Sequence, residues 1–155
     1  MQHLEFIQIL PVNLKVAWDF FSNPSNLKEI TPPYMNFRII NDLPEVFYEG
    51  MFIEYRVAPL AGISMEWITE ITHIRAPYFF IDEQRIGPYA IWHHEHHFEE
   101  TPGGIKMTDK LYYSLPFGFP GKFIDKLIVK NKVMDIFRYR NQKIASLFVI
   151  STKIY

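Results

Sequence analysis

The sequence contains no cysteine among its 155 residues. Disulfide bonds, thiolate metal sites and a cysteine nucleophile are therefore excluded. The formal net charge is only −1, so no excess of positive charge points to nucleic acid as a partner. No glycine-rich loop precedes a helical segment and no serine elbow motif is present, so the common phosphate-binding and hydrolase signatures are missing as well.

Long apolar runs are also missing. None approaches the ~20 residues that a bilayer-spanning helix needs. The first ten residues, MQHLEFIQIL, lack the basic region followed by an apolar run that is typical of a signal peptide. We therefore expect a soluble, cytoplasmic protein.

Apolar and aromatic residues are abundant instead, at 48% and 17% of the chain. A chain of this length suits one domain, residues 1–155, with one core. This many rings can fill a large core or line a hollow inside it.

The start of the chain predicts a strand and two short helices. A strand is expected over residues 3–10, ended by Pro11. Asn13 can then cap a helix, since its short side chain accepts hydrogen bonds from free backbone N–H groups. Pro24 is suited to the first turn of a second short helix over residues 25–30.

Six strands and a long helix follow. The strands are predicted from their apolar patterning and bounding turns at residues 37–41, 51–58, 63–74, 78–85, 89–99 and 105–115. Short connections make successive strands antiparallel neighbours. Helical spacing over residues 121–148 predicts a helix roughly 40 Å long, which must bury its apolar stripe on the sheet. The expected order is β-αα-β6-α: an α+β fold with a curved antiparallel sheet around a long C-terminal helix.

The turn TPGG at residues 101–104 sets the register of the last hairpin. If Glu100 pairs with Ile105, paired positions sum to 205, and alternation divides the side chains between two faces. One face then holds Trp92 opposite Tyr113, His94 opposite Leu111, His96 opposite Asp109, and Phe98 opposite Met107. The other face pairs Glu95 with Lys110 and carries His93 and His97 toward solvent.

The buried face thus combines two histidines and one carboxylate with rings, and four interpretations remain open. Asp109 and His96 satisfy each other in a packed core, or, with His94, they orient a ligand in an apolar cavity. A third is acid–base catalysis by His96 and Asp109, since histidine exchanges protons near neutral pH. The fourth is metal binding with His94, His96 and Asp109 as three ligands, but histidines on alternate strand positions without outer-shell partners are a weak metal signal.

Alternate loops of such a sheet lie at one end. The loops at residues 59–62, 86–88 and 116–121 share that end and carry four apolar residues, Leu60, Ile86, Phe117 and Phe119. These side chains pack against the long helix, or they form an apolar rim that admits a hydrophobic ligand or touches a membrane transiently. The basic residues of the last helix predict a solvated face.

Taken together, these residues resemble the START-like superfamily, of the polyketide cyclase/dehydrase and lipid-transport type. More narrowly, the chain resembles a bacterial subgroup of ligand-binding or cyclase/dehydrase-type proteins. The resemblance covers nearly the whole chain except its last residues, 149–155. It rests on Trp18-Asp19-Phe20-Phe21, Asn26-Leu27, Ile30-Thr31-Pro32, Trp67 with Ile71, Asp82, Gln84, Gly87-Pro88-Tyr89, Trp92-x-His94-x-His96-x-Phe98, Met107-x-Asp109, Tyr113 and Pro116-Phe117-Gly118.

The resemblance implies the helix-grip fold of the birch-pollen allergen, with a deep cavity between the sheet and the C-terminal helix. It implies a small hydrophobic or lipid-like ligand, and a carrier or sensor role or, alternatively, a polyketide-type cyclase or dehydratase. The expected ligand-binding residues are Trp67, Trp92, His94, His96, Phe98, Met107, Asp109 and Tyr113. We assign no cofactor, no metal and no catalytic residue, with His96 and Asp109 as candidates if the protein is an enzyme. The sequence predicts no oligomeric state.

Overall fold

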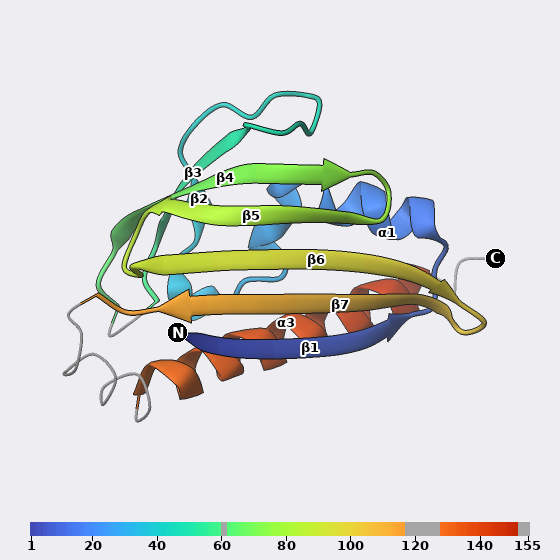
Figure 1. The fold of residues 1–155 in the computed structure, drawn as a ribbon. Coiled ribbons are helices and arrows are strands. Elements are labelled where there is room, and N and C mark those ends of the chain that lie inside the picture. The colour runs from blue at the N-terminus through green and yellow to red at the C-terminus, as the bar shows by residue number, and fades with distance from the viewer. Residues whose placement is uncertain (60–61, 117–127, 152–155) are drawn as a thin grey trace.

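The computed structural model describes residues 1–59, 62–116 and 128–151. Seven antiparallel strands form one curved sheet, in the order β1-β7-β6-β5-β4-β3-β2 (Figure 1). The strands are β1 (Gln2–Leu10), β2 (Arg38–Ile39), β3 (Phe52–Val57), β4 (Met65–Arg75), β5 (Phe79–Ile86), β6 (Ile91–Thr101) and β7 (Gly104–Ser114). The hairpin strands β6 and β7 therefore lie side by side, flanked by β5 and β1.

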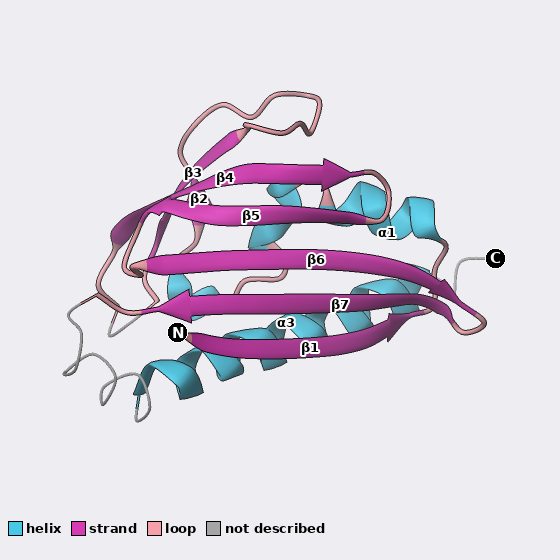
Figure 2. Ribbon diagram, in the orientation of Figure 1, coloured by secondary structure: helices cyan, strands magenta, loops and turns pink. Residues whose placement is uncertain are grey.

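The helices lie on one side of this sheet (Figure 2). They are α1 (Leu14–Phe21), the 3-10 helices η1 (Pro24–Lys28) and η2 (Pro33–Met35), and α3 (Lys130–Ser151). Asn13 caps α1 as predicted, because its side-chain oxygen accepts a hydrogen bond of 2.9 Å from the Val16 backbone N–H. The start of the long helix predicted over residues 121–148 falls partly outside the described residues. Among the helices in the described ranges, none has the length and apolarity needed to cross a membrane.

Two predicted elements are shorter than expected. The strand predicted over residues 37–41 pairs only at Arg38–Ile39. Beyond this strand, the Asn41 side chain hydrogen-bonds to the backbone of β3. Its amide N–H donates to the Phe52 carbonyl (3.1 Å), and its amide oxygen accepts from the Glu54 N–H (2.9 Å). The second short helix, predicted over residues 25–30, is the single 3-10 segment η1.

The long helix α3 attaches to the inner face of the sheet through one apolar stripe. Val133, Phe137, Ile144 and Phe148 recur at helical spacing and are each at most 4% exposed. Burial of each such side chain contributes about 1.5–3 kcal/mol. The stripe joins two apolar clusters that contain residues of β1, β6 and β7, and one of them also contains residues of α1. The packing therefore holds α3 against the inner face of the sheet, next to α1.

The register of the central hairpin is the predicted one. Trp92 pairs with Tyr113, His96 with Asp109 and Glu100 with Ile105, so paired positions sum to 205 throughout. Of the eight side chains predicted for the inner face, seven are buried and Trp92 is half-buried. Alternation and turn length therefore decide which histidines enter the molecule.

Candidate functional site

A cavity lies between the inner face of the sheet, α1 and η1, and α3. Its volume is about 160 Å³, counted as space that the centre of a water molecule can reach, and it is partly open to solvent. Most of its lining is aromatic or aliphatic and comes from α1, η1, β3, β4, β5, β6 and α3. The acidic, basic and imidazole side chains of the lining are grouped on one wall: Asp82, His94, His96 and Arg140.

Four of the eight expected ligand-binding residues line this cavity. They are Trp67, Trp92, His94 and His96. The Trp67 indole N–H donates to the Thr69 hydroxyl at 3.1 Å, and the Tyr55 hydroxyl lies 3.1 Å from the same oxygen. The Trp67 ring meets Trp92 edge-on at 5.2 Å. The cavity therefore has an aromatic wall in which the polar atoms of Trp67 and Tyr55 are already paired.

The other four expected residues lie outside the lining. Phe98 and Met107 belong to the cluster that packs against α1 and the end of α3. Tyr113 packs in the second cluster with Val133 and Phe137. Asp109 lies one layer behind the cavity, in contact with the histidines that do line it. The hairpin thus supplies both the wall and the layer supporting it.

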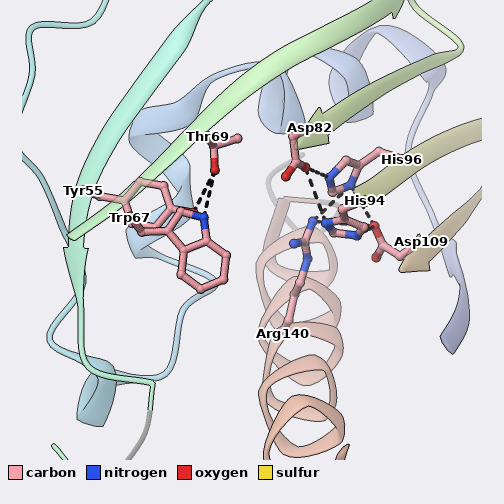
Figure 3. Close-up of polar contacts among 8 residues, drawn as sticks. All are labelled: Tyr55, Trp67, Thr69, Asp82, His94, His96, Asp109 and Arg140. Atoms are coloured by element: carbon pink, nitrogen blue, oxygen red, sulfur yellow. Dashed lines mark hydrogen bonds and ion pairs between the residues drawn. The ribbon is translucent and has the colours of Figure 1, made fainter. Parts of the chain in front are cut away.

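His96 is the centre of the polar wall (Figure 3). Its Nε2 lies 2.9 Å from Asp82 Oδ2, and its Nδ1 lies 2.8 Å from Asp109 Oδ1. The pair predicted from the hairpin register is therefore present, and a second carboxylate joins it from β5. His96 also stacks on Phe80 with ring centroids 4.3 Å apart, which holds the plane of the imidazole.

His94 contacts the same two carboxylates. Its Nε2 lies 3.2 Å from Asp109 Oδ1, and its Nδ1 lies 3.5 Å from Asp82 Oδ2. The two imidazole centroids are only 3.9 Å apart. Because the side chains of His94 and His96 are at most 5% exposed, water does little to screen this group.

Arg140 brings a cation from α3 to the same wall. Its Nη2 lies 3.8 Å from Asp109 Oδ1 and 3.5 Å from His96 Nδ1. Its guanidinium also lies 5.9 Å from the ring centroids of Phe21 and Phe137. Its side chain is 11% exposed, and its Nε has no hydrogen-bond partner among the described residues. Arg140 is therefore a largely buried cation whose Nε is unpaired among the described residues.

The carboxyl groups have lowered pKa values. Burial alone raises the pKa of Asp109, but the Arg140 charge and the hydrogen bonds of His94 and His96 outweigh it and hold this pKa well below its usual range. Burial likewise raises the pKa of Asp82, and the His96 hydrogen bond with the neighbouring positive charges reverses that effect and lowers it. Both carboxyl groups are therefore ionised at neutral pH.

The pKa values of the two histidines shift in opposite directions. Burial lowers the pKa of His94, and the nearby His96 lowers it further. Burial also acts to lower the pKa of His96, but its contacts with Asp109 and Asp82 outweigh burial and raise it. The surroundings of His96 therefore favour its charged form, and those of His94 favour its neutral form.

Sequence reasoning about the hairpin did not assign roles to Asp82, Arg140, Thr69 or Tyr55. The position of Asp82 could have indicated a role in the core, since it is an acidic residue in a strand, in phase with the buried Phe80. The position of Arg140 could have done so too, because it occupies the apolar stripe of α3 between Phe137 and Ile144. A charged residue in phase with a buried stripe needs a partner in the core.

The outer face of the same strands has its own polar group. His93 lies 2.9 Å from Glu83 and 3.4 Å from Glu95, and His97 lies 2.7 Å from Glu95. These side chains are 21–36% exposed, which agrees with the predicted placement of His93 and His97 outside the core. Of the predicted apolar rim, Ile86 is exposed, whereas Leu60, Phe117 and Phe119 lie outside the described residues.

No family model matches the chain, and no curated protein matches it either. Solved structures do match along nearly the full length. Protein Ms6760 from Mycobacterium smegmatis has a TM-score of 0.72 at 17% identity, over 96% of this chain and 92% of that one. Protein CV1439 from Chromobacterium violaceum has a TM-score of 0.69 at 11% identity, over 96% and 98%.

The Bet v 1-like allergen Ara h 8.0201 also matches, with a TM-score of 0.60 at 16% identity over 94% of this chain and 98% of that one. Identities this low carry information about the fold alone. The predicted helix-grip fold is thereby confirmed.

Proposed function

We propose that the protein binds a small hydrophobic molecule in the cavity between the sheet and α3, in a carrier or sensor role. The observation that carries this proposal is the lining itself: a partly open, mainly apolar cavity whose charged groups are confined to one wall. Small-molecule sites typically combine an apolar lining with a few polar groups that fix orientation. The cytoplasmic location and the extent of the domain stay predictions.

The cavity volume favours a compact ligand. An apolar cavity of roughly 150 Å³ accepts benzene, and this one, at about 160 Å³, is similar in size. A ligand with one ring or a short branched chain fits this space without rearrangement. A diacyl lipid would require the cavity to open further, so we place small aromatic or isoprenoid-like molecules ahead of whole lipids.

The polar wall supplies the orientation. Arg140, His94 and His96 line the same wall. A ligand with one oxygen acceptor can pair with a donor of this wall while its apolar part contacts Trp67 and Trp92. The two tryptophans also provide a signal, since their fluorescence reports on what enters the cavity.

A cyclase or dehydratase is the second candidate. It is favoured by one observation, the placement of His94 and His96 together in the cavity wall with two carboxylates in contact. In this role His96 and Asp109 are the acid–base pair and His94 orients the substrate. Turnover of a poly-β-ketone substrate tests it: loss of turnover in His96→Ala supports the role, and unchanged turnover refutes it.

Binding is tested with a panel of small apolar compounds, each with and without a carbonyl or carboxylate group, by thermal shift and tryptophan fluorescence. A bound compound raises the Tm by mass action. Leu27→Trp fills the cavity from η1, where Leu27 lines it, and should abolish the shift. Ile63→Trp is the matched control, because Ile63 is 65% exposed and is not among the lining residues.

Two results would contradict the proposal. One is that no compound in the panel shifts the Tm of the unmodified protein and none is retained in native mass spectrometry. The other is that the compounds stabilise Leu27→Trp as strongly as the unmodified protein, which would place their binding elsewhere.

A further inference from the structure

We propose that Asp82, His94 and His96 form a binding site for one divalent first-row transition-metal ion, with Asp109 as its shared outer-shell partner. Each of the three residues offers one ligand atom within 4.8 Å of the other two. We take these atoms to be Asp82 Oδ2, His94 Nδ1 and His96 Nε2, because Asp82 Oδ2 lies closest to those two nitrogens. Two imidazoles and one carboxylate are a donor set used for Zn²⁺ and for non-haem Fe²⁺.

The distances suit a common ion. Ligand atoms about 2.0–2.2 Å from a metal lie roughly 2.9–3.5 Å from each other on neighbouring coordination positions. Asp82 Oδ2 is 2.9 Å from His96 Nε2 and 3.5 Å from His94 Nδ1. One carboxylate oxygen is thus at coordination spacing from both imidazoles.

The outer shell is the feature that distinguishes this group from a chance cluster. Metal-binding histidines almost always donate their second ring N–H to a carboxylate, a carbonyl or water. Here the second nitrogens, His94 Nε2 and His96 Nδ1, both lie at Asp109 Oδ1, at 3.2 and 2.8 Å. One carboxylate therefore directs the remaining nitrogen of each histidine toward Asp82, as Figure 3 lets the reader follow.

The sheet produces this arrangement through its register. Asp82 on β5 pairs with His94 on β6, and His96 on β6 pairs with Asp109 on β7. Because His94 and His96 are two residues apart, they lie on the same face. The two carboxylates consequently flank the two imidazoles from opposite neighbouring strands, and neither strand alone could build the site.

A metal ion at this site would take the place of a hydrogen-bond proton. In the metal-free group, His96 Nε2 and Asp82 Oδ2 lie 2.9 Å apart, at hydrogen-bond distance, and one proton can be shared between them. A metal ion displaces this proton and takes its place between the same atoms. Arg140 contacts Asp109 and His96 Nδ1. The proposed coordinating atom of His96 is the other ring nitrogen, Nε2, so these contacts are not made at the coordinating atom.

The coordination sphere has room on the cavity side. All three ligand residues line the cavity, so water or an oxygen of a bound molecule can complete the sphere from there. A metal held by three protein ligands with an open position is the arrangement of catalytic rather than purely structural sites. Metal binding is measured here without any organic ligand, so its failure would leave the proposed ligand binding standing.

The test starts from chelator-treated full-length protein titrated with Co²⁺, followed by visible absorption and by competition with Zn²⁺. We expect saturation at one ion per chain. Asp82→Asn should weaken binding by at least ~100-fold, and Asp109→Asn by ~10–100-fold through the outer shell. The control His93→Ala/His97→Ala removes the outer-face histidines and should change the affinity less than twofold.

A measurement that needs no variant accompanies the titration. In ¹⁵N-histidine NMR of the Zn²⁺-loaded protein, His94 should be coordinated through Nδ1 and His96 through Nε2, with the other nitrogen protonated in each. The proposal is overturned if no ion saturates the protein up to millimolar concentration. It is equally overturned if the paired alanine control abolishes binding, or if NMR places the ion on other nitrogens.

Discussion

Replacing Asp109 with asparagine removes one negative charge from the buried group and little volume. Asp109 is 2% exposed, and its Oδ1 contacts His96 at 2.8 Å, His94 at 3.2 Å and Arg140 at 3.8 Å. After the change, Asp82 is the one carboxylate left beside His96 and Arg140. Breaking a buried ion pair by removing one partner costs about 3–5 kcal/mol.

The corresponding fall in Tm is roughly 6–20 °C, since each kcal/mol shifts the Tm of a domain of this size by about 2–4 °C. Chemical denaturation of metal-free protein at pH 7 measures the free energy of unfolding directly. Glu95→Gln is the matched control, because Glu95 also contacts two histidines, His93 and His97, but on the outer face.

A partly exposed pair on the surface contributes about 0–1 kcal/mol, so Glu95→Gln should leave the midpoint nearly unchanged. The reasoning fails if the free energy of unfolding of Asp109→Asn lies within about 1 kcal/mol of that of the unmodified protein. Asp109 would then be a neutral or well-solvated group, and the charge assignment of the buried wall would be wrong.

Three further predictions follow from the same structure. The lowered pKa of Asp109 contributes stability above pH ~4, and this stability is lost on acidification. The free energy of unfolding should therefore fall less steeply between about pH 5 and 2 in Asp109→Asn than in the unmodified protein. Parallel curves of unfolding free energy against pH would contradict this. Thr69→Val leaves the buried Trp67 N–H unpaired and should cost about 1–3 kcal/mol in urea denaturation. Thr72→Val should cost little, because the Thr72 hydroxyl has no partner among the described residues, and equal losses would refute the distinction. Asn13→Ala removes the α1 cap and should cost about 1 kcal/mol, whereas Asn13→Ser should retain most of the stability.

The sequence was sufficient for the hairpin. Strand side chains alternate with period two, and the four-residue turn leaves one consistent register. Those two local rules place His94 and His96 inside, His93 outside and Asp109 opposite His96, as the structure has them. The fold could be predicted for a similar reason, since the local apolar patterning of each strand and of the long helix indicates which element forms.

The rest of the polar wall depended on tertiary structure. Asp82 meets His94 because β5 pairs with β6 at one register, and the connection over residues 87–90 has no turn motif that selects it. Arg140 reaches Asp109 only because α3 docks at one rotation and one depth across the sheet. Docking is decided by how Val133 and Phe137 pack against distant strands, a collective fit that no local spacing encodes. The sequence by itself therefore determined which side chains face inward, while packing between distant segments decided which of them meet.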